Sequence, residues 1–234
     1  MEMEINKNYT KHYLDRTHKY VYPTEFVVRT FLANYPNLSM KKPEHGDKVL
    51  DIAFGDGRNT IMLLQQGYDV SGIEVTEEIV EQTRIRLKTL KSAEGGNPPI
   101  LKVGRNSRIP FDDDSFDYIL ACNCCYYCDE GESMRDNLRE YSRVLKPGGF
   151  LVASAIHAEC FIFDGAEKLP DGTMRIAKDP YNNRVGYRLH GFSSTNEVED
   201  AFSSYFHDFS FAEENNDYYG IAVRAFWVVC RNKD

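Results

Sequence analysis

The chain has 234 residues, of which 42% are hydrophobic and 27% are charged, and its formal net charge is −8. This composition supplies enough apolar side chains for a sizeable core and excludes a disordered chain, while the acidic balance argues against a nucleic-acid binder. The sequence shows neither a secretory signal nor an 18-residue apolar run, so we expect a cytoplasmic domain with no membrane contact and with reduced cysteines.

Short β-rich runs alternate with helical periods in the middle of the chain. Strands are expected at residues 48–53, 68–74, 100–103, 116–122 and 150–155. Helices are expected after the first, second and fourth of them, the last one beginning at Ser133 as N-cap. Such alternation predicts parallel strands joined by right-handed crossovers in a doubly wound α/β sheet.

Two further β-rich runs, residues 209–213 and 221–230, follow a short helix near the carboxyl end. Only the polar segment 214–220 separates them, and so short a link cannot hold a crossover helix. We therefore expect these two strands to pair antiparallel, which makes the sheet mixed at its far edge.

Two segments stand outside this alternation and are interpreted as additions to one domain. The amino-terminal one is aromatic, and a helix is expected from Thr24 across Phe26 and Phe31, either as a lid over the ligand site or as surface packing. The other lacks any long period, which is typical of functional loops. The expected division is a lid or cap (1–46), a core (47–156), a substrate-side insert (157–192), and a helix with the strand pair (193–234).

A glycine-containing turn follows the first strand. Gly55 and Gly57 let the backbone approach a ligand closely, and Glu74 ends the second strand, where a carboxylate can accept both hydroxyls of a ribose. Thr60 stands in place of the third glycine of the dinucleotide fingerprint, so the loop favours an adenosine-type ligand over a dinucleotide. The alternative is an ordinary strand–helix turn beside a solvated glutamate.

Four motifs in family order resemble the class I S-adenosylmethionine-dependent methyltransferases. They are residues 49–57, 72–74, 109–117 and 145–151. The resemblance covers roughly residues 47–156 and implies a Rossmann-like, mostly parallel seven-stranded sheet with an antiparallel last strand. It also implies S-adenosylmethionine as cofactor and S-adenosylhomocysteine as product.

The same resemblance implies roles for individual residues. Asp51 would anchor the loop and reach toward the methionine end of the cofactor, Glu74 would accept the ribose hydroxyls, and Val75 would pack on the adenine. The other implied cofactor contacts are Ala53, Phe54, Gly55 and Gly57 in the loop, Asn106 and Ser107 at the adenine, and Cys122 and Asn123 at the methionine.

Two positions depart from the family pattern. Ala53 replaces a usual glycine and would crowd the loop slightly. Arg105 stands where many members have an aspartate that binds the adenine amine, and a guanidinium offers no acceptor for that amine. Adenine recognition is therefore expected from Asn106, Asp112 or the backbone.

A sulfonium methyl is already electrophilic, so such an enzyme mainly aligns its acceptor, with a general base where the acceptor must lose a proton. His157, after the fifth strand, and His190 are the candidate bases, and exposed loop histidines are the alternative. The candidates for acceptor binding are Tyr126, Tyr127, Tyr187 and Arg188.

Four cysteines fall within the seven residues from Cys122 to Cys128. Structural zinc sites use two ligand pairs far apart in sequence, and one tetrahedral site from so short a run is sterically awkward. We expect buried thiols and no metal, with a redox role as the alternative.

The predicted activity is methyl transfer by in-line displacement to a small-molecule acceptor such as a sugar or an amine, carried out by a monomer or homodimer. A non-catalytic S-adenosylmethionine-binding partner subunit is one alternative. A nucleotide-dependent oxidoreductase is the other, but it predicts a third loop glycine and a Tyr-x-x-x-Lys pair, and the sequence has neither.

Overall fold

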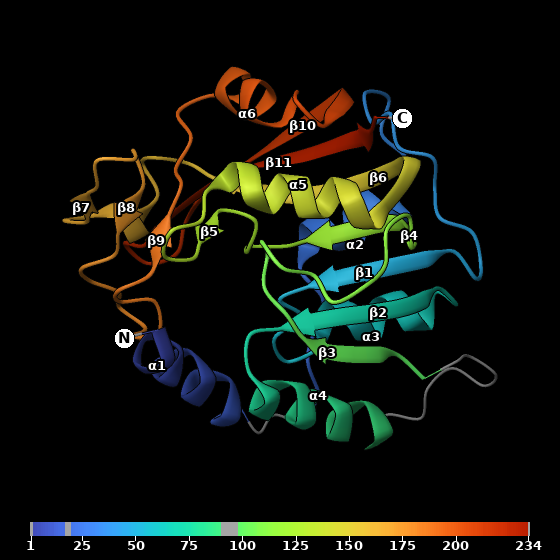
Figure 1. Cartoon of the computed structure of the whole chain (residues 1–234), viewed down its shortest axis with the longest axis horizontal. Coiled ribbons are helices and arrows are strands. Elements are labelled where there is room, and N and C mark those ends of the chain that lie inside the picture. The colour runs from blue at the N-terminus through green and yellow to red at the C-terminus, as the bar shows by residue number, and fades with distance from the viewer. Residues whose placement is uncertain (1, 17–19, 90–97, 234) are drawn as a thin grey trace.

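The computed structural model describes residues 2–16, 20–89 and 98–233, and a seven-stranded sheet in the order β10-β11-β6-β4-β1-β2-β3 forms its centre (Figure 1). The strands are β1 (Lys48–Ile52), β2 (Asp69–Glu74), β3 (Ile100–Val103), β4 (Phe116–Ala121), β6 (Leu145–Ile156), β10 (Phe206–Asp217) and β11 (Ala222–Asn232). Strand β11 is antiparallel to both of its neighbours, and the other pairs are parallel. The predicted class I fold, with an antiparallel last strand, is confirmed.

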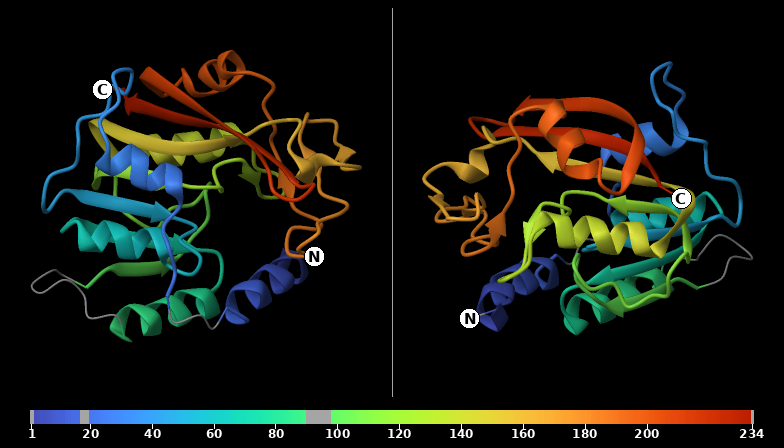
Figure 2. Two further views of the ribbon diagram at one scale, coloured as in Figure 1. Left: turned by 180° about the vertical axis from the view of Figure 1, so that it is seen from behind. Right: turned by 45° about the horizontal axis from the view of Figure 1, so that its top comes forward.

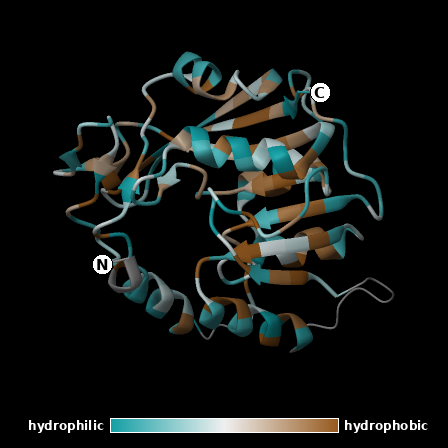
Figure 3. Ribbon diagram, in the orientation of Figure 1, coloured by the Kyte–Doolittle hydropathy of each residue, from teal (hydrophilic) through white to brown (hydrophobic). Residues whose placement is uncertain are grey.

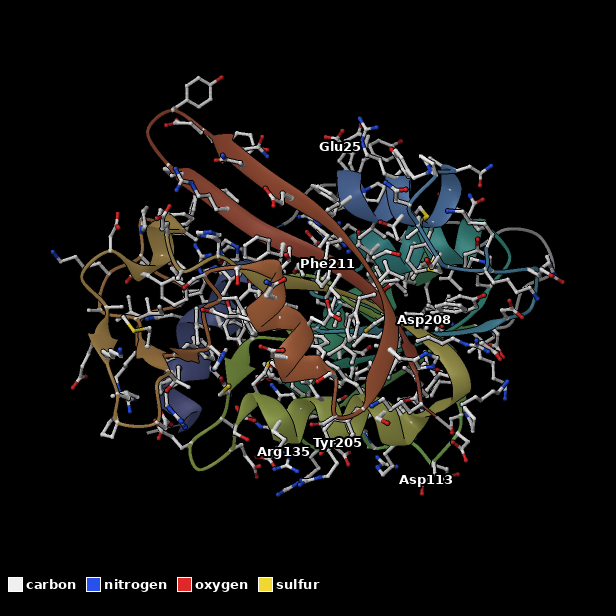
Figure 4. The ribbon with its side chains drawn as sticks, turned by 90° about the horizontal axis from the view of Figure 1, so that it is seen from above. Glu25, Asp113, Arg135, Tyr205, Asp208 and Phe211 are labelled. Carbon is white, nitrogen blue, oxygen red and sulfur yellow. The ribbon has the colours of Figure 1, made fainter. Side chains whose placement is uncertain are left out.

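Helices cover both faces of this sheet. They are α1 (Glu2–Leu14), α2 (Glu25–Leu32), α3 (Arg58–Gln65), α4 (Glu77–Thr89), α5 (Met134–Val144) and α6 (Thr195–Phe202). One face packs against α5 and α6 and the other against α2 and α3 (Figure 2). Glu25 at the start of α2 and Arg135 in α5 accordingly lie on opposite sides of the sheet in Figure 4.

Side chains of the central strands alternate between the two cores. In β1, Val49 joins the core under α2 and α3, and Leu50 joins the core under α5 and α6. Val228 and Val229 of β11 divide in the same way. Strands buried on both faces are rich in apolar residues, and hydrophobic stretches recur along the central strands in Figure 3, although β1 also holds the buried Asp51.

The insert between β6 and α6 forms a small sheet that the sequence did not predict. The order of its strands is β5-β9-β8-β7. The insert supplies β7 (Glu167–Lys168), β8 (Met174–Arg175) and β9 (Arg188–Leu189), which the 3-10 helix η1 (Phe161–Phe163) precedes, and the segment after β4 supplies β5 (Tyr127–Cys128). Two-residue strands carry no readable period. Because β5 follows β4 in the chain and pairs with β9, the insert is tied to the carboxyl-end edge of the main sheet, where α1 also lies (Figure 1).

Strand β10 is longer than the sequence indicated. The expected strand ended at residue 213, but β10 continues through polar residues to Asp217, and the turn joins Tyr218 to Ile221. The far part of the β10–β11 hairpin projects beyond the body of the protein (Figure 4), so both of its faces meet water and polar residues suit it. None of the described helices is both long and apolar enough to cross a membrane.

Candidate active site

A cavity of about 400 Å³ lies at the carboxyl ends of the parallel strands. Ile52 ends β1, Glu74 ends β2, Cys122 follows β4 and Ile156 ends β6, and all four line the cavity. In open α/β sheets this edge is the general ligand site, because the chain switches direction beside the first strand there. Residues of α1 and of the insert complete the lining.

The carboxylate of Glu74 is held at the bottom of this cavity. Its Oε1 accepts hydrogen bonds from the Gly55 amide and from the Tyr9 hydroxyl, both at 3.1 Å, and its Oε2 accepts from the Val75 amide at 2.7 Å. The side chain is buried, and burial raises the pKa of Glu74 to about 7 despite these three donors.

The glycine loop is shaped by Asp51 and by left-handed backbone. Asp51 is buried behind the cavity and accepts a hydrogen bond from the Thr60 hydroxyl at 2.6 Å, which ties β1 to α3. Gly55 has φ 55° under the ring of Tyr13, and an added Cβ would lie 2.5 Å from that ring. Ala53 also has φ 53°, a conformation that costs a residue with a Cβ roughly 1–2 kcal/mol.

The two buried carboxyls make the stability of the protein pH-dependent. Burial raises the pKa of Asp51, like that of Glu74, to about 7. The folded state therefore binds these protons more tightly than the unfolded chain, and the stabilisation, complete below the unfolded pKa of about 4, is lost as the pH rises through 7. We expect the free energy of unfolding to fall by roughly 1–3 kcal/mol between pH 5.5 and 8.

Urea denaturation of the cofactor-free protein at both pH values measures this change. Glu74→Gln and Asp51→Asn should each flatten the profile, because an amide does not titrate. If both variants lost as much stability between pH 5.5 and 8 as the native protein does, other groups would be the cause of the pH dependence.

The adenine side of the cavity is built by backbone and apolar groups. Phe54, Val75 and the segment 104–106 line it. The Asn106 side chain is engaged, since its Nδ2 donates to the Cys124 carbonyl and its Oδ1 accepts from the Tyr141 hydroxyl, both at 2.8 Å. Arg105 forms an ion pair with Asp129 at 2.9 Å. Ser107 and Asp112 do not line the cavity, which leaves the backbone of this segment to meet an adenine.

The segment after β4 forms the floor of the acceptor side. Asn123 has φ 57°, and its amide donates to the Ser154 hydroxyl at 2.7 Å. Tyr126 and Tyr127 stack with ring centroids 5.2 Å apart, and Tyr187 meets Tyr127 edge-on at 5.3 Å. These residues and Cys122 line the cavity together, as the sequence interpretation required of an acceptor pocket.

Arg188, His157 and His190 lie outside the lining of this cavity. Arg188 is buried, forms an ion pair with Asp171 and donates to the Asp129 carbonyl at 2.7 Å, so it holds the small sheet together. Nδ1 of His157 accepts a hydrogen bond from the Glu159 backbone amide at 3.0 Å, and the ring of His190 packs against Phe192. Neither imidazole lines the cavity, although the backbone amide of His190 donates to the Tyr126 carbonyl at 2.9 Å.

Among the histidines that the structure describes, His12 of α1 is the one that lines the cavity, and the sequence interpretation did not single it out. Burial and the neighbouring guanidinium groups of Arg16 and Arg184 lower the pKa of His12 below its usual 6.5. The imidazole is therefore neutral near pH 7 and able to accept a proton.

Other lining residues were also missed. Tyr9 and Tyr13 come from α1, which no capping or periodic pattern predicted, and Arg16 follows that helix. Phe161 and Arg184 come from the insert. Arg58 lies directly after the glycine loop, and its guanidinium forms a bidentate pair with Asp56 at 2.7 and 2.9 Å. The position of Arg58 directly after the glycine-loop motif was the one feature of the sequence that could have indicated its place in the cavity lining.

The cysteine run is a set of free thiols, of which Cys124, Cys125 and Cys128 are buried and Cys122 is half-buried. Cys124 donates to the Ile52 carbonyl at 3.3 Å and Cys125 to the Ser154 carbonyl at 3.0 Å, so each thiol bonds to a neighbouring strand. Burial raises the pKa of both thiols. In the described part of the chain, no three His, Cys, Asp or Glu side chains converge as a metal site needs.

Comparison with known proteins identifies a domain family and a fold that this chain matches. Residues 50–153 match the family model of a methyltransferase domain. A S-adenosylmethionine-dependent methyltransferase of Methanosarcina mazei has the same fold, with a TM-score of 0.67 at 19% identity over 91% of this chain and 99% of that one. Residues 50–153 therefore match a methyltransferase domain, and the fold of the chain is that of the class I S-adenosylmethionine-dependent methyltransferases.

Curated relatives match this chain at higher sequence identity, but over a smaller share of their own length. The putative methyltransferase YqeM of Bacillus subtilis is 28% identical over 76% of this chain and 64% of its own length. A demethylmenaquinone methyltransferase of Tropheryma whipplei is 33% identical over 46% of this chain and 41% of its own length. The chain thus spans less than two thirds of the curated relatives that it matches.

Proposed function

We propose that the chain transfers the methyl group of S-adenosylmethionine to a small-molecule acceptor. The observation that carries this proposal is the Glu74 carboxylate, fixed at the end of β2 beside the Gly55 loop, in one cavity with the segment after β4. A buried acceptor with two oxygens at this place suits the two hydroxyls of a ribose. The bound donor supplies an electrophilic methyl on sulfur.

The residues of this chain would then bind the cofactor, orient the acceptor and exclude water. Glu74 takes the ribose, the backbone of 104–106 meets the adenine, and Asn123 with the tyrosines after β4 orients the acceptor. Tyr9 and Tyr13 of α1 cover the glycine loop and exclude water from it. Exclusion of water and alignment of the acceptor are the main requirements of methyl transfer.

A calorimetric titration with S-adenosylmethionine and, separately, with NADH tests the cofactor assignment. We expect binding of the first and none of the second, because the Thr60 side chain replaces the glycine that a pyrophosphate needs. An acceptor screen that follows S-adenosylhomocysteine release then tests transfer itself. Binding without turnover in the presence of a stoichiometric partner would favour the partner-subunit alternative. A cytoplasmic monomer or homodimer completes the proposal.

For an acceptor that loses a proton, we propose His12 as the base. His12→Ala should lower turnover about 10²-fold, the usual lower range for a general base, and leave S-adenosylhomocysteine affinity nearly unchanged. His207→Ala, on exposed β10, is the matched control. The same loss in His157→Ala, with His12→Ala fully active, would return the role to His157.

A further inference from the structure

A buried aspartate folds the loop between β8 and β9 around itself. The side chain of Asp179 is 0% exposed and accepts hydrogen bonds from three backbone amides, those of Tyr181 and Asn183 at 3.1 Å and that of Arg184 at 3.0 Å. Three donors on one carboxylate give the loop a single conformation. The loop therefore presents its side chains from a rigid base.

The same carboxylate also fixes the guanidinium of Arg184. Asp179 accepts from Nε at 3.0 Å and from Nη2 at 2.8 Å, which occupies one edge of the guanidinium. The guanidinium carbon lies 5.3 Å from the ring centroid of Phe161 and 5.6 Å from that of Tyr181, so two aromatic rings hold its plane. The other edge, Nη1 with the second hydrogen of Nη2, donates to no residue of the described chain.

Asn183 adds an acceptor beside this free edge. It lines the cavity together with Arg184 and Tyr181, and its Oδ1 is buried with no hydrogen-bond partner among the described residues. An unpaired buried oxygen costs free energy unless a ligand supplies a donor. The loop thus offers two parallel N–H groups and one oxygen to whatever enters the cavity.

Arg184 and Asn183 belong to a different part of the cavity from Glu74, where the ribose of the cofactor is proposed to bind. Phe161 follows β6, whereas the ribose acceptor Glu74 ends β2, and β4 and β1 lie between those strands. At a strand spacing of about 4.8 Å, the two ends of the cavity are roughly 14 Å apart. A donor whose ribose lies on Glu74 directs its methyl toward β4, and the loop stands beyond it.

We propose that Arg184 binds an anionic group, a carboxylate or a phosphate, on the methyl acceptor, and that Asn183 Oδ1 accepts a hydrogen bond from an N–H or O–H of the same molecule. This inference rests on the proposed function, since it specifies the acceptor for that reaction. A fixed guanidinium edge matches the two oxygens of either anion, and the surrounding rings favour an acceptor with a flat apolar part.

Fluorine NMR of small probes tests the proposal on the intact protein saturated with S-adenosylhomocysteine. The probes are 4-fluorobenzoate, 4-fluorophenyl phosphate and the neutral 4-fluorobenzamide. We expect at least one anion to bind about 10-fold or more tightly than the amide, the range for a hydrogen bond to a charged group. The two anion arms distinguish a carboxylate site from a phosphate site.

Variants assign the preference to Arg184. Arg184→Gln should reduce the anion preference to about twofold or less, whereas Arg184→Lys, which keeps the charge without the paired donors, should retain an intermediate preference. Arg139→Gln removes an exposed arginine paired with Asp136 on α5 and should leave the preference intact. Should Arg184→Gln fail to fold, Arg184→Lys decides, with a several-fold loss of anion affinity.

Calorimetry with S-adenosylhomocysteine on every variant separates the two proposals. Normal affinity for S-adenosylhomocysteine together with equal affinities for 4-fluorobenzoate, 4-fluorophenyl phosphate and 4-fluorobenzamide would overturn the anion site and leave the proposed function standing. An anion preference that survives in Arg184→Gln would also overturn it. No S-adenosylhomocysteine binding by the native protein would instead remove the proposed function.

Discussion

Replacing Glu74 with alanine is expected to weaken S-adenosylmethionine binding by about 1–3 kcal/mol, the range for losing a charged hydrogen-bond partner. The carboxylate is buried at the end of β2 and already organises the Gly55 and Val75 amides around one point. Its removal takes away the ribose acceptor and leaves these two amides without a partner. The expected change corresponds to roughly 5- to 150-fold in the dissociation constant.

Titration calorimetry on the folded variant measures the effect. Glu78→Ala, an exposed position in the first turn of α4, is the matched control and should bind as the native protein does. A thermal unfolding curve of each protein shows whether the variant is folded. Native affinity in folded Glu74→Ala would refute the placement of the ribose.

Replacing Asp179 with alanine is expected to lower the free energy of unfolding by about 3 kcal/mol, because it leaves a buried guanidinium and three backbone amides without their acceptor. Urea denaturation measures this loss. Asp200→Ala, an exposed position in α6, is the control and should stay within about 0.5 kcal/mol of the native protein. An unchanged urea midpoint in Asp179→Ala would mean that the loop is held by its rings alone.

The central sheet was predictable because its signals are local. Each core strand is a short apolar run, and the helix after β2 starts with carboxylates that suit its dipole, so order and direction followed from alternation. The short link after residue 213 sufficed to predict the antiparallel pair. The predicted strand 209–213 was too short at both ends, because β10 runs over Phe206–Asp217. The later end was missed because a projecting hairpin admits polar residues that read as a turn.

The acceptor side was not predictable in the same way. Tyr9 and His12 reach the cavity only because α1 packs beside α4, and no spacing in the sequence expresses a contact between segments so far apart. Arg184 depends on Asp179, five residues earlier, through side-chain bonds to backbone amides that have no period. The nearby Arg188 was selected instead, although the structure uses it within the small sheet.

The hydrogen bond from Tyr9 to Glu74 joins α1 to the end of β2. Oε1 of Glu74 already accepts from Tyr9 and from the Gly55 amide, so an incoming ribose hydroxyl competes with the tyrosine for that oxygen. Tyr9 and His12 belong to one helix and both line the cavity. Under the proposed function the methyl donor on Glu74 and the acceptor beside His12 would therefore meet the same helix.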